Sequence, residues 1–182
     1  MDRLSELARH GKVLADEKLV IGAGGNISEK DGDSLLIKRR GSDMSAGDPE
    51  AYSRVSFAAI GEEKEMLSSE TPLHVACYGA RKDVGAVAHV HSPYMVAAAA
   101  RTALLESPSY EFDCVINGPA PVVDYIQPGS EALAEAVALR VEKGANAVLL
   151  KRHGAVLVGA DIAQACLRAV ALERACVAFL HT

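Results

Sequence analysis

The sequence predicts an α/β domain built around a mixed sheet. Segments with helical spacing of apolar residues alternate with short apolar runs typical of strands, which is the pattern of an α/β fold. Two pairs of strand-like runs are separated by only a few residues, which favours hairpins over an all-parallel sheet. The chain has 182 residues, 49% of them hydrophobic, and we expect one domain, residues 1–182, with a sizeable core.

The first third of the chain predicts one helix followed by three strands. Residues 2–19 place apolar side chains on one helical stripe. Residues 22–26 include three glycines, which favour a loop. The polar segment 39–51 is expected to lie on the surface. Strands are expected on both sides of the turn at 31–33 and again after the polar segment, at 27–29, 34–37 and 52–57.

The middle of the chain predicts a helix, a buried strand and a second helix. Residues 70–81 are expected to form a helix that Ser68 or Ser69 caps. The apolar run within 84–91 predicts a buried strand, which Ser92 and Pro93 end. A helix over 93–101 should follow, because proline is tolerated in a first helical turn.

The last third predicts two helices and three strands. Residues 102–128 hold four of the seven prolines, so we expect a loop that contains one strand, at 120–125. A helix over 131–143 and a final helix from Asp161 to near the C-terminus show helical spacing of apolar residues. Between them lie two strands, at 147–151 and 155–158.

The composition disfavours several classes of function. The formal net charge is −5 with scattered lysine and arginine, and only 4% of residues are aromatic, so we expect no nucleic-acid partner. The longest apolar stretches, such as 75–80 and 95–100, are too short to span a membrane, and no N-terminal signal is visible, so we expect a cytoplasmic protein. Four cysteines without a Cys-x-x-Cys pair are expected to be reduced, with Cys77, Cys166 and Cys176 buried in helices.

Three histidines are the strongest functional signal. His89 and His91 are two apart in a strand, so their rings should project from the same face. His153 also follows an apolar run, and Gly154 comes directly after it. Three histidines with an open fourth position are typical of catalytic zinc, although imidazole also suits Mn²⁺, Co²⁺ and Fe²⁺. Alternating histidines also occur in ordinary strands, so this ligand set is a hypothesis.

The remaining histidines are weaker candidates. We expect His74 to be packed or capped, and His10 and His181, which lie near the chain ends, to be solvated. Three short motifs could bind an anion such as phosphate through hydroxyls, backbone N–H groups or positive charge, at 24–26, 39–42 and 68–69. Each could equally be only a turn or a helix cap. Glu70, expected in the first turn of its helix, becomes a candidate general base if that turn faces a metal.

The chain resembles the class II aldolase family in the order and spacing of four motifs: Gly25-Asn26-Ile27-Ser28, Ser68-Ser69-Glu70, His89-Val90-His91 and His153-Gly154. The resemblance covers nearly the whole chain and is closest to the fuculose-1-phosphate aldolases. It implies a three-layer α/β/α fold with a central mixed, largely antiparallel sheet. It also implies a homotetramer with active sites at subunit interfaces.

The resemblance also implies roles for individual residues. His89, His91 and His153 match the zinc ligands, and Glu70 matches the acid/base carboxylate. The candidate residues for binding the substrate's phosphate are Gly25, Asn26, Arg40, Gly41, Ser68 and Ser69. The implied reaction is retro-aldol cleavage of a small phosphorylated ketose through an enediolate that the metal stabilises.

Two departures from the family pattern keep other functions open. Arg40 stands where relatives usually have serine or threonine, so the bound anion could be a phosphate or a carboxylate of an acidic sugar. The tail tyrosine of the aldolases has no counterpart, and neither Tyr110 nor Phe112 matches their mid-chain tyrosine well. A decarboxylase, dehydratase or 4-epimerase on the same metal scaffold is therefore the alternative, and a non-catalytic module similar to the adducin head is a third hypothesis.

Overall fold

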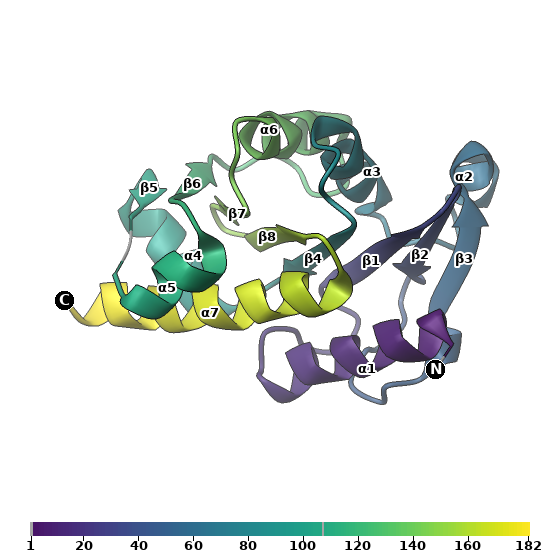
Figure 1. Cartoon of the computed structure of the whole chain (residues 1–182), viewed down its shortest axis with the longest axis horizontal. Coiled ribbons are helices and arrows are strands. Elements are labelled where there is room, and N and C mark those ends of the chain that lie inside the picture. Colours follow the sequence, from purple (N-terminus) through teal and green to yellow (C-terminus); the bar gives the residue numbers. More distant parts are fainter. Residues whose placement is uncertain (1, 107) are drawn as a thin grey trace.

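A computed structural model describes residues 2–106 and 108–182 as a sheet between two layers of helices (Figure 1). Across these residues the sheet has eight strands in the order β3-β2-β1-β4-β8-β7-β6-β5. Only the β6–β7 pair is parallel among the described strand pairs, which confirms the expected mixed and largely antiparallel sheet. The strands are β1 (Asn26–Asp31), β2 (Ser34–Lys38), β3 (Tyr52–Ser56), β4 (Ala86–Val90), β5 (Leu104–Leu105), β6 (Ala120–Val123), β7 (Ala147–Leu150) and β8 (Gly154–Gly159).

The helices divide between the two faces of the sheet. One face is covered by α3 and α6, and the other by α1, α4, α5 and α7, which gives the three-layer α/β/α arrangement (Figure 1). The short helix α2 lies beside the edge strand β3. The helices are α1 (Arg3–Asp16), α2 (Ile60–Glu63), α3 (Thr71–Ala80), α4 (Pro93–Arg101), α5 (Tyr110–Ile116), α6 (Glu131–Glu142) and α7 (Ile162–His181).

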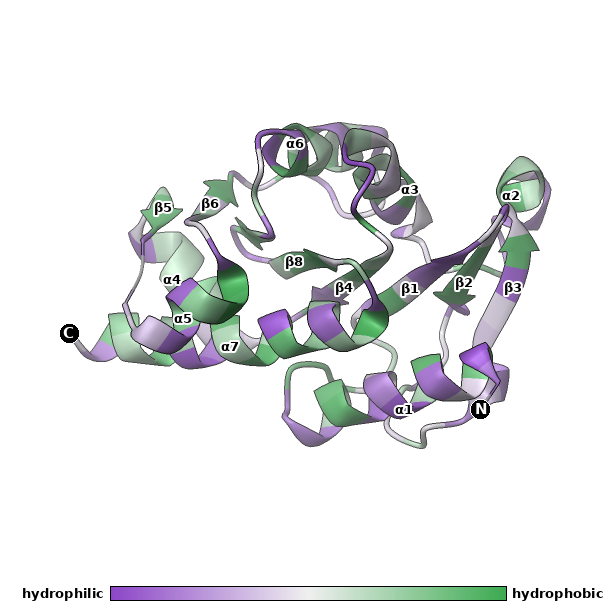
Figure 2. Cartoon of the chain, in the orientation of Figure 1, coloured by the Kyte–Doolittle hydropathy of each residue, from purple (hydrophilic) through white to green (hydrophobic). Residues whose placement is uncertain are grey.

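The alternation of strand side chains builds a separate core on each face. In β4, Ala86, Ala88 and Val90 pack towards α7, whereas Val87 packs in the cluster that contains α3 and α6. The strands β7 and β8 are apolar throughout, whereas β1 carries hydrophilic residues, and hydrophilic residues also interrupt the helices (Figure 2). His89 shares the parity of Val87, so its ring lies on the face that α3 covers.

The segment 102–128 differs most from expectation, because it contains β5 and the helix α5 in addition to the expected strand. Ser109 caps α5, since its hydroxyl accepts a hydrogen bond from the Phe112 N–H at 3.2 Å. Phe112 and Ile116 lie four residues apart on one face of α5. Both are buried in the core cluster that includes residues of α7. Seven residues are too few for periodicity to separate a helix from a loop, particularly between prolines.

Other expectations have mixed outcomes. Cys77, Cys166 and Cys176 are buried free thiols, as expected. His181 is exposed as expected, but the expectation for His10 was wrong. His10 is only 7% exposed, because its ring turns back along α1 and its Nδ1 bonds the carbonyl of Glu6 at 3.0 Å. Among the helices described, none combines the length and the apolar character needed to cross a membrane.

Candidate functional site

The site forms where the ends of three neighbouring strands meet. In the antiparallel register, Asn26 at the start of β1 lies opposite His89 in β4. On the other side of β4, Val90 lies opposite Ala155 in β8. His91 directly follows β4, and His153 directly precedes β8. The strand pairing therefore brings together residues that are far apart in the sequence.

The three histidine rings converge through their Nε2 atoms. The Nε2 of His89 lies 2.9 Å from that of His91 and 3.2 Å from that of His153. His89 Nδ1 donates a hydrogen bond to the carbonyl oxygen of Ala155 at 3.0 Å, so its Nε2 carries a lone pair. One candidate ligand atom from each histidine lies within 4.8 Å of the other two.

The environment favours the neutral form of all three rings. Burial, together with the neighbouring histidines, lowers the pKa of His89 well below its usual value. Burial lowers the pKa of His91 to about 4 and also lowers the pKa of His153. Neutral imidazoles whose lone pairs face one another repel unless a cation or a proton lies between them. This donor set therefore fits a divalent transition metal.

Close backbone packing fixes the two ends that carry the histidines. Gly154 has φ +151°, and a Cβ on it would lie 1.9 Å from the carbonyl oxygen of Val90, so only glycine allows β8 to approach β4 at this point. On the other side, the N–H of His91 donates to the carbonyl of Leu19 at 3.0 Å. The positions of the rings thus follow from the backbone of the sheet and of the loop before β1.

Glu70 lies beside the histidines. Its Oε1 is 3.9 Å from His153 Nε2, and both side chains are largely buried. Burial raises the pKa of Glu70, while a hydrogen bond from the backbone of Gly129 acts in the opposite direction. Glu70 Oε2 is buried without a hydrogen-bond partner among the described residues, so this carboxyl group can still bind a ligand or a proton.

The start of α3 differs from expectation by one or two residues. Glu70 is the N-cap of α3 rather than a residue of its first turn, and Ser68 and Ser69 precede the cap. The hydroxyl of Ser68 still accepts a hydrogen bond from the Glu70 N–H at 3.3 Å. The physical reason is that Pro72 occupies an early helical position, which sets the start of the helix just before it.

A cavity of about 360 Å³ collects the predicted site residues, since all of them except His89 line it. His89 is fully buried behind His91 and His153. The lining residues are Ala23, Gly24, Gly25, Asn26, Lys38, Arg40, Gly41, Ser68, Ser69, Glu70, His91, Pro128 and His153. Hydroxyls, glycine backbone and the positively charged side chains of Lys38 and Arg40 thus line the same cavity as His91, His153 and Glu70.

Lys38 is a cavity residue that the sequence did not reveal. It is only 2% exposed, and its Nζ donates to the carbonyl of Ala23 at 2.9 Å. Burial lowers its pKa, because the cavity provides little solvation for the ammonium group. The available signal was a lysine that directly continues the apolar run of β2, where a solvated lysine is unexpected.

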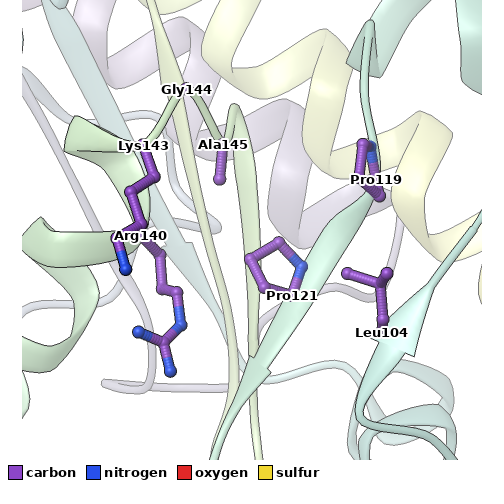
Figure 3. A pocket seen from close by; sticks show the side chains of 7 residues that line it. All are labelled: Leu104, Pro119, Pro121, Arg140, Lys143, Gly144 and Ala145. Carbon is purple, nitrogen blue, oxygen red and sulfur yellow. The ribbon is translucent and has the colours of Figure 1, made fainter.

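A second pocket lies away from this site. Its lining is largely apolar, with Pro121 at the centre and Arg140 and Lys143 along one side (Figure 3). It includes no histidine, cysteine or carboxylate. Tyr110 is 83% exposed and Phe112 is buried in the core, so neither belongs to the histidine cavity.

Comparison with known proteins gives a consistent result. Residues 5–180 match the sequence model of the family described as Class II Aldolase and Adducin N-terminal domain. A protein named L-fuculose phosphate aldolase from Methanococcus maripaludis (strain C7) is 35% identical over 161 residues, which cover 88% of this chain and 87% of the relative. A protein named 3-oxo-tetronate 4-phosphate decarboxylase from Pectobacterium atrosepticum is 28% identical over 163 residues, covering 87% and 74%.

The fold is also shared with solved structures. The crystal structure of L-fuculose-1-phosphate aldolase from Thermus thermophilus superposes with a TM-score of 0.89 at 24% identity. The superposition covers 98% of this chain and 93% of that one. At this identity the likeness concerns the arrangement of strands and helices.

Proposed function

Because the chain belongs to the class II aldolase and adducin N-terminal domain family, we propose that it is a metal-dependent aldolase acting on a small phosphorylated ketose such as L-fuculose 1-phosphate. One observation carries this proposal. Glu70 Oε1 lies 3.9 Å from His153 Nε2, inside a cavity that hydroxyls, glycine backbone and two positively charged side chains also line. A metal, an acid/base group and an anion site within one cavity are the parts that this reaction needs.

His89, His91 and His153 would hold the cation, for which we propose Zn²⁺ because three neutral histidines with an open position are typical of catalytic zinc. When bound, the cation would act as a Lewis acid that stabilises negative charge on the substrate's carbonyl and neighbouring hydroxyl oxygens. Metal analysis of the purified protein would identify the ion, with Mn²⁺, Co²⁺ and Fe²⁺ as the alternatives.

The polar groups of the cavity other than the histidines and Glu70 would bind the phosphate. Ser68 and Ser69 precede the N-terminus of α3, where the serine hydroxyls and the helix dipole favour an anion. Asn26 would add its carboxamide, and the loops that contain Gly25 and Gly41 would allow close approach to the backbone. Phosphate binding at this position would orient the sugar towards Glu70.

Glu70 would transfer the proton at carbon. In cleavage, the carbon–carbon bond breaks and its electron pair stays on the fragment that carries the ketone. The hydroxyl of the other fragment loses its proton to solvent water as that fragment becomes an aldehyde. Glu70 would donate a proton to the carbon that keeps the electron pair. The raised pKa of Glu70 supports this role, because the carboxyl group then holds its proton at a higher pH than a solvated glutamate.

The test is cleavage of L-fuculose 1-phosphate by the zinc-loaded protein, with dihydroxyacetone phosphate and lactaldehyde as the measured products. Glu70→Gln should lower kcat by about 10²–10⁴-fold, the usual contribution of general acid–base catalysis, and should retain the metal. Glu142→Gln, at the end of α6 and exposed, is the matched control and should keep full activity. Absence of aldehyde product from metal-loaded protein would contradict the proposal.

A decarboxylase is the second candidate, favoured by the two cations Lys38 and Arg40 in the cavity and by the decarboxylase-named relative. Loss of CO₂ from 3-oxo-tetronate 4-phosphate also yields dihydroxyacetone phosphate, so that product alone does not separate the two reactions. Release of CO₂ from the keto acid without cleavage of the ketose phosphate would favour the decarboxylase. Mass spectrometry of the product would reveal a 4-epimerase, which leaves the mass unchanged, or a dehydratase, which removes one water.

We also propose that the cavity is completed in a homotetramer, as the family resemblance implies. Two exposed apolar side chains stand next to cavity loops and support a covering partner: Ile21 is 85% exposed and Met66 is 53% exposed. Light scattering coupled to gel filtration would measure the mass. Replacing both side chains with serine should shift the mass towards the monomer, and a monomeric wild-type protein would overturn this assembly.

A further inference from the structure

A buried chain of hydrogen bonds runs from the cavity into the space beneath α3. His74 Nε2 bonds the Oδ1 of Asn26, and His74 Nδ1 lies 2.6 Å from the Oγ of Ser28. The same Oγ lies 2.6 Å from the hydroxyl of Tyr78. His74 and Ser28 are completely buried, and Tyr78 is 7% exposed, so solvent does not compete for these bonds.

The chemistry of the four groups fixes the direction of this chain. A carboxamide oxygen only accepts, so His74 Nε2 must carry the proton that bonds Asn26. Burial lowers the pKa of His74 to about 3, so the ring is neutral and its Nδ1 must accept from Ser28. The Ser28 hydroxyl donates its only proton to His74, so its oxygen accepts a hydrogen bond from the Tyr78 hydroxyl. Burial raises the pKa of Tyr78, so this hydroxyl keeps the proton that it donates.

We propose that His74 is a positioning residue, which holds the Asn26 carboxamide with its oxygen inward so that the Nδ2 amide presents its N–H donors to the anion of the substrate. Asn26 lines the cavity, and its Nδ2 makes no hydrogen bond to the described residues. This inference rests on the anion site of the proposed function, and it assigns the orientation of that site to residues that do not touch the substrate.

Ser28 is the residue that selects the productive arrangement. Without its hydroxyl, nothing in the described chain would hold His74 Nδ1 as an acceptor, and the ring could carry its proton there. His74 Nε2 would then accept, and the carboxamide would turn over to bond it with Nδ2. The Asn26 oxygen would face the anion, where two acceptors repel each other.

The test uses the zinc-loaded 182-residue chain and two measurements that need no turnover. Nitrogen-15 NMR of the histidine rings reports which nitrogen of His74 is protonated, and calorimetry measures the affinity for inorganic phosphate. Wild-type protein should show the Nε2–H tautomer. Ser28→Ala should lose this single tautomer and weaken phosphate binding by at least about 10-fold, the scale of one hydrogen bond to a charged group.

Three further variants separate positioning from general damage. Tyr78→Phe removes a hydroxyl from the same chain but leaves Ser28 able to donate, so tautomer and phosphate affinity should stay within about 2-fold of wild type. Ser28→Thr keeps the hydroxyl and should restore binding. In an Asn26→Ala background, Ser28→Ala should have no further effect, because Ser28 acts through Asn26.

The contrary results are equally distinct. Unchanged phosphate affinity in Ser28→Ala would overturn the positioning role. The role would also be overturned if Ser28→Ala weakened phosphate binding as much in the Asn26→Ala variant as it does in the wild-type protein. A wild-type protein with the Nε2–H tautomer that binds no phosphate would instead overturn the anion site of the proposed function, while the hydrogen-bond chain would stand.

Discussion

Lys38 and Arg40 give the cavity two positive charges of different character. The Lys38 ammonium is buried and fixed on the carbonyl of Ala23, whereas Arg40 is exposed and its Nη2 bonds the carbonyl of Lys64 at 3.2 Å. A buried ammonium with one backbone partner retains two N–H donors for an anion. Lys38 should therefore contribute affinity for the anion, while solvent screens the charge of the exposed Arg40 guanidinium.

We expect Lys38→Met to raise the KM for L-fuculose 1-phosphate by about 10-fold, since a hydrogen bond to a charged group contributes about 1.5–3 kcal/mol. The kcat should change little, because Lys38 is not the acid/base group. The free energy of unfolding should stay the same or rise, because the variant no longer buries a charge. Steady-state kinetics and urea unfolding measure both, with the exposed Lys12→Met as control. An unchanged KM would place the anion elsewhere.

Individual site residues differ in how far the sequence could predict them. The convergence of His89, His91 and His153 could be anticipated because the side-chain period of a strand is fixed and each histidine adjoins an apolar run. Lys38 could not, because burial of a lysine depends on contacts made by the loop that contains Ala23. His10 was predicted wrongly, because a position near the chain end does not show that a side chain on α1 turns back along its own helix.

At the scale of elements, the β4–β8 pair sets the geometry of the site. Gly154 permits the closest approach of the two strands, and its neighbour His153 turns towards the cavity. Arg152, with φ +61°, adopts the left-handed conformation in the middle of the β7–β8 connection. A change at Gly154 should therefore move His153 relative to His91.

Gly154→Ala should destabilise the protein by more than about 2 kcal/mol and weaken zinc binding, because the new Cβ meets the Val90 carbonyl and forces the strands apart. Gly118→Ala is the matched control: Gly118 has φ +133° but no atom close to its missing Cβ. Gly118→Ala should lose less stability than Gly154→Ala, because it introduces only the strain of a positive φ and no clash with the backbone. Thermal unfolding and metal titration measure the two effects, and equal losses in both variants would exclude the strand-contact explanation.

Most long elements could be predicted, and the short ones could not. The segment 93–101 coincides with α4, and the expected helix at 131–143 differs from α6 by one residue, because proline, serine caps and helical spacing agree there. By contrast, α2, α5 and β5 span four, seven and two residues. Such elements are held by the neighbours on which they pack, and local sequence carries little of that information.

At the scale of the whole molecule, four histidines with lowered pKa values link stability to pH. Burial lowers the pKa of four histidines: His74, His89, His91 and His153. At a pH below the ordinary histidine pKa of 6.5, the unfolded chain therefore binds more protons than the native protein. Stability is therefore present above pH 6.5 and is lost as the pH falls towards the native values. Glu70, whose pKa burial raises, acts in the opposite direction.

We expect the free energy of unfolding of the metal-free protein to fall by roughly 1–3 kcal/mol per pH unit between pH 7 and pH 5. Urea unfolding at several pH values in the presence of a chelator measures this slope. His181→Gln removes an exposed histidine and should leave the slope unchanged. A flat profile would show that these four histidines are already charged in the native state.

The neighbouring positions of β4 and β8 have a further consequence for folding. His89 and His153 are 64 residues apart in the sequence, and the chain between them forms α4, α5 and α6. An ion bound by both would tether the two ends of that stretch, much as a disulfide does, and closing such a loop contributes about 4 kcal/mol. Removing zinc should then lower the melting temperature by roughly 10 °C, with a much smaller change in His153→Gln. The ion would thus serve as a reversible cross-link, and metal supply would govern how long the folded protein survives.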